Sequence, residues 1–178
     1  MGVVIVTGVP GVGKSTVMNA AKDYGYKIVN FGSTMFEEAQ KEGVDNRDEM
    51  RKLPVEKQQD LQRQAGDRIS KMGDVVVDTH ASILTPSGFM PGLPEWTIRA
   101  LNPNIIVLVE ATAQEIAGRR SKDPSRLRDA DDIDMHQKVN RDYAATAASI
   151  VGATVSIVEN HDDDVDIAVE QFRKVLTK

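Results

Sequence analysis

The sequence has no cysteine, no long hydrophobic run and no surplus of basic residues, and each absence removes a class of protein. Without cysteine the chain can form neither a disulfide nor a thiolate metal site, which favours a cytoplasmic protein. The longest apolar runs have only the length of a strand, so we expect no transmembrane segment. The three isolated histidines lack metal-ligand spacing, which argues against structural zinc. Because the first residues already read as a strand, we expect no signal or transit peptide.

The charge of the chain argues against nucleic acid as a partner. The net charge is −5, and residues 1–122 carry 15 basic and 15 acidic side chains, whereas residues 123–178 carry 7 and 12. No segment forms the basic stripe that is typical of nucleic-acid binders. The length and an ordinary composition, 40% hydrophobic and 28% charged, indicate one soluble globular domain over residues 1–178. We therefore expect neither nucleic acid nor a membrane as a partner.

What the chain does contain is a glycine-rich stretch, GVPGVGKST, directly after the apolar run 3–6. It fits the P-loop pattern G-x-x-x-x-G-K-[ST], in which backbone N–H groups surround the phosphates of a nucleotide. Lys14 should reach the β- and γ-phosphates, and the Ser15 hydroxyl should bind Mg²⁺. A chance glycine-rich turn is the alternative, but the strand–loop–helix context argues against it. The sequence predicts a nucleoside triphosphate site made of Gly8, Val9, Pro10, Gly11, Val12, Gly13, Lys14, Ser15 and Thr16.

Strands and helices alternate along the rest of the chain, which predicts an α/β fold with a five-stranded parallel sheet covered by helices on both faces. The expected strands are 3–7, 27–30, 75–77, 104–110 and 155–158. The expected helices are 14–24, 33–41 with Ser33 as N-cap, 45–72 with an interruption at Pro54, 94–101, 112–122, 131–151 and 163–177. The Pro/Gly-rich stretch 79–94 is expected to be an ordered loop. Ligands bind at the carboxyl ends of such strands, which gathers at one edge the P-loop, 30–33, 78–80, Glu110 and Asn160.

Asp78 follows the buried apolar run 75–77 and is the natural carboxylate partner of the metal. In P-loop enzymes an aspartate at this place polarises Mg²⁺ or its waters. The alternative is a solubilising residue at the end of a strand. Because the P-loop independently requires a metal partner, we predict that Asp78, with Ser15, binds Mg²⁺.

The helical segment 33–72 lies next to the P-loop, where a phosphate-bearing acceptor would dock. Within it, Arg47 and Arg51 are four residues apart on one helix face. Guanidinium groups bind phosphate through two parallel hydrogen bonds. We predict that Arg51 binds the acceptor phosphate, with Arg47 as the second candidate. The alternative is that Arg51 pairs with Asp48 or Glu49 on a solvated face.

The stretch GRRSKDPSRLRDADD, 118–132, contains arginines separated by aspartates. An ordinary charged loop is one reading, with Arg119 paired to Glu115 on the same helix. The other is a lid that brings guanidinium groups onto the transferring phosphoryl group and excludes water. Because the P-loop implies phosphoryl chemistry, we predict the lid.

Together these features resemble a nucleoside monophosphate kinase. The stretches GVPGVGKST, NFG (30–32), RDEMRKLP (47–54), DTH (78–80), PGLP (91–94) and the Arg-rich segment resemble the archaeal-type adenylate kinases in particular. The resemblance covers nearly the whole chain. It implies a P-loop NTPase fold with a helical AMP-binding insert (33–72) and a short lid (about 119–132) without zinc. It also implies Mg²⁺-dependent, reversible phosphoryl transfer from ATP to AMP, giving two ADP, and a homo-trimer.

The resemblance further implies roles for single residues. AMP would contact Gly32, Arg51 and His80. The catalytic residues would be Lys14, Arg120, Arg128 and Arg141, although Arg119 matches the start of the lid as well as Arg120 does. An arginine after the third strand binds the acceptor phosphate in many family members, and Arg99 is the only candidate here. The stretch 159–163 matches the loop beside the adenine of ATP.

Two other functions stay open at this point. The chain could phosphorylate another nucleoside monophosphate or a small hydroxyl acceptor such as shikimate or gluconate, because single-sequence reasoning does not place the groups that read the acceptor. A nucleotide-dependent switch protein is the third possibility. Against it, the sequence lacks an N-K-x-D guanine-reading motif, and a slow switch has no evident use for an Arg-rich lid.

Overall fold

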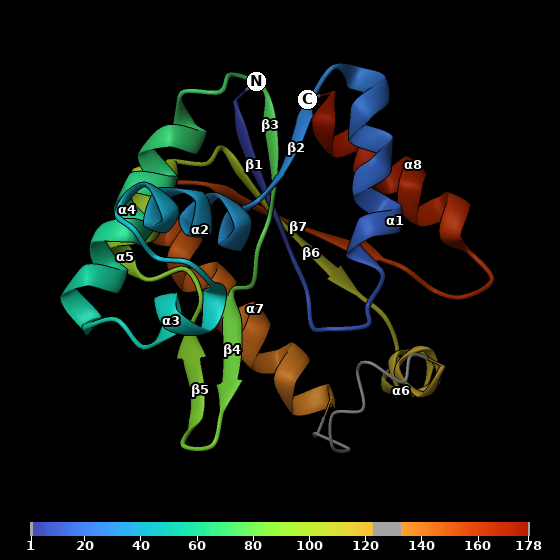
Figure 1. Ribbon diagram of the computed structural model, residues 1–178. Helices are drawn as coiled ribbons and strands as arrows, with labels where there is room; N and C mark the ends of the chain where they lie inside the picture. Colours follow the sequence, from blue (N-terminus) through green and yellow to red (C-terminus); the bar gives the residue numbers. More distant parts are fainter. Residues whose placement is uncertain (1, 123–132, 178) are drawn as a thin grey trace.

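A five-stranded parallel sheet forms the centre of the molecule (Figure 1). The computed structural model describes residues 2–122 and 133–177. The strand order is β2-β3-β1-β6-β7, and every neighbouring pair in this sheet is parallel. The strands are β1 (Val3–Thr7), β2 (Lys27–Asn30), β3 (Val75–Asp78), β6 (Ile105–Glu110) and β7 (Thr154–Glu159). The predicted sheet is confirmed.

Helices cover both faces of the sheet, also as predicted (Figure 1). One face carries α2 (Phe31–Lys41), α4 (Val55–Ser70), α5 (Glu95–Leu101) and α7 (Ile133–Val151), with the short α3 (Arg47–Arg51) beside them. The other carries α1 (Lys14–Met18), its 3₁₀ continuation η1 (Asn19–Tyr24) and α8 (Val165–Leu176). Helix α6 (Ala113–Ser121) lies beyond the carboxyl end of β6.

The central strand β1 shows why an unbroken apolar run was the right signal for this sheet. Val3 and Ile5 point into the core under α2, α4, α5 and α7, whereas Val4 and Val6 point into the core under α1 and α8. All four side chains are almost completely buried. A parallel strand covered on both faces has no solvent side and so shows no alternation of polar residues.

The expectation of an ordered loop over 79–94 is wrong in its centre. Residues there form an antiparallel hairpin of β4 (Ser82–Thr85) and β5 (Gly88–Pro91). Proline removes a ladder donor, but Pro91 stands at the last position of β5, opposite Ser82, where a short two-stranded ladder tolerates it. The hairpin is held against α7, because the Tyr143 hydroxyl donates to the carbonyl of Phe89 at 3.0 Å.

Two helices also differ from the prediction, one at its start and one in its second half. Helix α2 is capped by Asn30 rather than Ser33: the Asn30 side chain accepts from the Ser33 N–H at 2.9 Å. The helix after the P-loop keeps α geometry only to Met18 and then continues as a 3₁₀ helix to Tyr24. It ends before Gly25, as expected, with that glycine at a positive φ of 78°.

Among the described residues, no helix combines the length and the apolar character that crossing a membrane requires.

Candidate active site

The predicted phosphate-binding loop connects β1 to α1 at the carboxyl edge of the sheet (Figure 1). It turns through two glycines with positive φ, Gly11 at 88° and Gly13 at 90°, a conformation that side chains with a Cβ disfavour. The Val12 N–H closes a tight turn on the carbonyl of Val9 at 3.2 Å. Helix α1 then begins at Lys14, so Ser15 and Thr16 lie in its first turn.

Lys14 is held at the carboxyl end of β3. Its Nζ lies 2.7 Å from Oδ1 of Asp78 and donates to the carbonyl of Thr79 at 2.9 Å. The side chains of Lys14 and Asp78 are 11% and 24% exposed, so the ion pair is partly shielded from water. Strand register explains the contact, since Asp78 pairs with Val6, just before the loop begins. The structure thus brings together the lysine and the aspartate that the sequence singled out.

A chain of hydrogen bonds continues from Asp78 into the helical insert. Asn30 donates from Nδ2 to Asp78 Oδ2 at 3.1 Å, and Ser33 donates from Oγ to Asn30 Oδ1 at 3.2 Å. Arg47 donates from Nη2 to Ser33 Oγ at 2.8 Å. Its guanidinium also lies over the ring of Phe36, 5.7 Å from the centroid. Arg47 is therefore connected to the P-loop lysine through four side-chain contacts.

Gly32 lies beneath this chain, at the start of α2. A Cβ at Gly32 would lie 3.4 Å from Asn30 Oδ1 and 3.8 Å from Arg47 Nη1. The backbone of residue 32 is thus adjacent to the guanidinium of Arg47.

Arg51 lies outside this chain. Its side chain is 69% exposed, and Nη1 lies 3.0 Å from Oδ1 of Asp48, as the solvated-face alternative expects. The Arg51 carbonyl accepts from the Gln58 side chain at 3.1 Å. Arg99 is likewise exposed and pairs with Glu95 one turn earlier in α5, at 2.8 Å. Neither side chain points into a hydrogen-bond network of the sheet edge.

His80 follows β3, and its surroundings favour the neutral form of its imidazole. Desolvation of the imidazole, and then the nearby Lys14 charge, lower the pKa of His80 to about 4, although the residue as a whole is exposed to solvent. The backbone at His80 passes very close to Gly92, where a Cβ would lie 2.0 Å from the His80 carbonyl oxygen. Glycine at 92 is therefore required by close packing of the loop against the hairpin.

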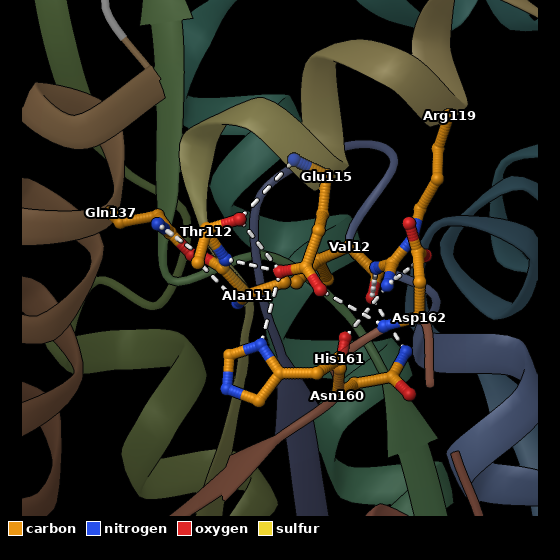
Figure 2. Close-up of polar contacts among 9 residues, drawn as sticks. All are labelled: Val12, Ala111, Thr112, Glu115, Arg119, Gln137, Asn160, His161 and Asp162. Carbon is orange, nitrogen blue, oxygen red and sulfur yellow. Dashed lines mark hydrogen bonds and ion pairs between the residues drawn. The ribbon is translucent and has the colours of Figure 1, made fainter. Parts of the chain in front are cut away.

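The arginines at the end of α6 contact the back of the P-loop. Arg120 donates from Nε to the carbonyl of Pro10 at 2.8 Å. Arg119 donates from Nη1 to the carbonyl of Val12 at 3.0 Å and also reaches Asn160 and Asp162 (Figure 2). The sequence left open which of the two faces the nucleotide, and the structure ties both to the loop itself.

Arg141, on α7, reaches the carboxyl end of β6. It donates from Nε to Glu110 Oε1 at 2.6 Å and from Nη2 to Oε2, so the pair is bidentate. Glu110 is 7% exposed, and its hydrogen bonds raise the pKa of Arg141. The predicted catalytic Arg128, and most of the predicted lid, lie outside the described residues.

Several polar residues of this edge were not predicted as site residues. Asn140 on α7 accepts from Thr7 at 3.4 Å and from Ser82 at 3.2 Å, and Thr7 in turn accepts from the Ala81 N–H at 2.7 Å. These buried bonds fix the chain after β3 against β1. The signal was available for Thr7, a polar residue that ends an apolar strand, but not for Asn140, whose partners are more than 50 residues away.

Comparison with known proteins identifies the family. Residues 7–137 match the family described as an AAA domain. An adenylate kinase of Methanopyrus kandleri is 52% identical in a match that covers 96% of this chain and 95% of the relative. An adenylate kinase of Methanocaldococcus jannaschii is 50% identical, with 98% and 97% covered. The chain belongs to the adenylate kinase family. The resemblance expected from the motifs is thereby confirmed.

Solved structures of other kinases share the fold. A shikimate kinase from Bacteroides thetaiotaomicron matches with a TM-score of 0.58 and 13% identity, covering 99% of this chain and 98% of that one. A gluconokinase from Sinorhizobium meliloti matches with a TM-score of 0.53 and 15% identity, covering 99% and 94%. At such identities the likeness shows the P-loop kinase fold alone, whereas the adenylate kinases are similar in sequence over nearly their full length.

Proposed function

We propose that this chain catalyses the reversible, Mg²⁺-dependent transfer of the γ-phosphoryl group of ATP to AMP, giving two ADP. The close relation to adenylate kinases supports the substrates. One observation carries the site: Lys14, Asp78, Asn30, Ser33 and Arg47 form a continuous polar chain. It joins the phosphate-binding loop to Arg47 in α3 of the insert. Donor and acceptor phosphates would thus be bound at adjacent places, as direct transfer requires.

On the donor side, the backbone of Gly8–Thr16 would surround the phosphates of ATP, and Lys14 would contact the β- and γ-phosphates. Mg²⁺ would be held by the Ser15 hydroxyl and, partly through water, by Asp78. The donor set fits, because hydroxyl and carboxylate oxygens are the hard ligands that Mg²⁺ prefers, and it keeps several of its waters. When bound, the ion supplies charge that offsets the negative phosphate oxygens.

On the acceptor side, the insert 33–72 would bind AMP, with contacts to Gly32, Arg51 and His80. Arg51 is exposed and paired with Asp48, so it would turn from an ion pair at the surface to the AMP phosphate. His80 would act as a neutral hydrogen-bonding group at physiological pH, because its pKa lies at about 4.

The remaining site residues would act on the transferring phosphoryl group. Arg120, Arg128 and Arg141 would supply positive charge to its oxygens, with the lid at about 119–132 bringing the first two close. Arg141 is 54% exposed and oriented by the buried Glu110. We further propose, from length and composition, that residues 1–178 are one kinase domain and, from the lack of cysteine, that the protein is cytoplasmic. The family resemblance alone supports assembly as a homo-trimer.

An ADP-formation assay tests this function. ATP and Mg²⁺ are supplied with AMP, UMP, CMP, GMP, shikimate or gluconate in turn, and Lys14→Ala serves as the inactive control. We expect turnover with AMP well above every other acceptor. Faster turnover with another acceptor would replace the proposed substrate, and ATP consumption that no acceptor stimulates would favour a switch protein.

A further inference from the structure

We propose that Arg119 is a positioning residue of the donor site, which holds the Val12–Gly13 peptide of the P-loop in one orientation. The inference rests on the donor site proposed above and concerns a residue to which that proposal gives no role. Arg119 lies in the last turn of α6, and its side chain extends from that helix to Val12 of the loop (Figure 2).

All three nitrogens of the Arg119 guanidinium donate to groups of the protein. Nη1 donates to the carbonyl of Val12 at 3.0 Å, and Nη2 donates to the carbonyl of Asn160 at 2.8 Å. Nε donates to Oδ1 of Asp162 at 2.8 Å, and the arginine side chain is only 21% exposed. A planar guanidinium with three such partners is held in one place. Its bonds are directed to the protein, which indicates a role in positioning.

The Val12 carbonyl determines where the next N–H group points. The described residues contain no cis peptide bond. In a planar trans peptide the C=O of one residue and the N–H of the next point in opposite directions. With its carbonyl turned toward Arg119 behind the loop, Val12 leaves the N–H of Gly13 turned to the other side, where the phosphates would bind. Backbone N–H groups of this kind form anion-binding loops.

Asn160, in the loop after β7, also binds the Val12 carbonyl and so helps to fix the Val12–Gly13 peptide. It is 3% exposed, and its Nδ2 donates to the Val12 carbonyl at 2.9 Å. The carbonyl therefore accepts two bonds, one for each lone pair. A Cβ at Gly13 would lie 2.4 Å from that Nδ2, so the Asn160 side chain can come this close only because residue 13 is glycine. Glycine rotates freely, which is why the adjoining peptide needs external partners to stay in one orientation.

Arg120 repeats the arrangement two residues earlier in the loop. Its Nε donates to the carbonyl of Pro10 at 2.8 Å, and the next residue, Gly11, has a φ of 88°. A Cβ at Gly11 would lie 2.9 Å from Cγ of Arg120. Two successive arginines of α6 thus bind the Pro10 and Val12 carbonyls of the P-loop. The residue after each of these carbonyls is a glycine with positive φ.

The experiment compares binding of ATP with binding of inorganic tripolyphosphate, which has the phosphates but no base. If Arg119 acts through the P-loop, Arg119→Ala weakens both ligands by the same factor, at least about tenfold because charged hydrogen bonds are lost. AMP affinity changes less than about twofold, which also reports a folded protein. Arg63→Ala is the matched control, because Arg63 is an exposed arginine paired with Asp60 on α4. It should leave all three affinities unchanged.

Two further variants keep the inference testable should Arg119→Ala fold poorly. Arg119→Lys should recover only part of the affinity, since an ammonium cannot bond Val12, Asn160 and Asp162 in one plane. Asp162→Asn should weaken ATP and tripolyphosphate equally but less. A loss confined to ATP would show direct contact with the base and overturn the inference. Binding of both ligands by Arg119→Ala as tightly as by the wild type would overturn the role of Arg119 and leave the proposed donor site standing. A wild-type protein that binds neither ATP nor tripolyphosphate would overturn the donor site as well.

Discussion

Replacing Arg51 by alanine tests the acceptor site, and the contacts of Arg51 set the size of the expected rise in KM for AMP. Arg51 and Asp48 are 69% and 81% exposed, and an exposed ion pair of this kind contributes only about 0–1 kcal/mol. Two hydrogen bonds to the α-phosphate of AMP would contribute about 1.5–3 kcal/mol each. When Arg51 leaves Asp48 for the AMP phosphate, the net gain in binding free energy is then about 2–6 kcal/mol. A factor of ten in affinity corresponds to about 1.36 kcal/mol. KM for AMP should therefore rise at least tenfold in Arg51→Ala.

The assay measures steady-state kinetics and the binding of ATP and AMP separately. In Arg51→Ala kcat should fall as well, because a loosely held acceptor loses its alignment. ATP affinity should change little, and the free energy of unfolding should stay within about 0.5 kcal/mol. Arg51→Lys should restore the charge but only part of the function. Arg47→Ala is the informative companion, since Arg47 is the arginine that contacts Ser33.

The reasoning is refuted if Arg51→Ala keeps a normal KM for AMP, or if ATP and AMP weaken equally. A large rise in KM for AMP in Arg47→Ala alone would transfer the phosphate contact from Arg51 to Arg47.

The other predictions concern the donor site, the arginines and pH. Lys14→Ala should fold but lose turnover, and a folded variant that keeps more than a few per cent of kcat would contradict the role of Lys14. Arg128→Ala and Arg141→Ala should lower kcat by about 10³–10⁵-fold, or about 4–7 kcal/mol, and losses below about tenfold at both would remove the assignment. The Nδ1 atom of His161 lies 3.0 Å from Oε2 of Glu115. This hydrogen bond raises the pKa of His161 above its ordinary 6.5 and lowers the pKa of Glu115 below its ordinary 4.5. The pair should therefore stabilise the fold fully between pH 4.5 and pH 6.5. Its contribution, about 1 kcal/mol for a partly exposed pair whose side chains are 36% and 20% exposed, is lost as pH rises through the pKa of His161 or falls through that of Glu115. A melting-temperature difference between wild type and His161→Gln that does not vary with pH would contradict this.

The sheet and its helices could be predicted because their signals are local. The apolar runs of β1, β3 and β6 are bounded by polar or glycine residues, and buried parallel strands require that pattern. Pro54 and Gly25 marked helix boundaries through backbone chemistry alone. The edge that collects the site then followed from the rule for parallel sheets.

The hairpin β4–β5 could not be predicted in the same way. Its sequence is rich in proline and glycine, which read as a loop, and its ladder has only four residue pairs. A two-stranded ribbon of that size needs packing against another element, here α7 through Tyr143. That contact joins residues more than 50 positions apart, so no local pattern reports it.

The partners of the arginines were also beyond local reasoning. Charge and spacing placed Arg51 and Arg47 on one face, but the structure distinguishes them by what each touches. Arg47 contacts Ser33 across a loop, while Arg51 contacts its neighbour Asp48. In the same way, the arginines of the stretch 118–132 predicted phosphate ligands, but the bonds of Arg119 to Val12 and Asn160 depend on loops far apart in sequence.

Conversion of ADP alone tests the central claim most directly, because it needs both nucleotide sites and no other substrate. The purified protein is incubated with ADP and Mg²⁺, and ATP, AMP and inorganic phosphate are quantified over time. We expect ATP and AMP to accumulate in equal amounts without inorganic phosphate, and Lys14→Ala to form neither. Phosphate release without AMP, or no conversion by a folded protein that binds ADP, would contradict the assignment of this chain as an enzyme that transfers phosphoryl groups between adenine nucleotides.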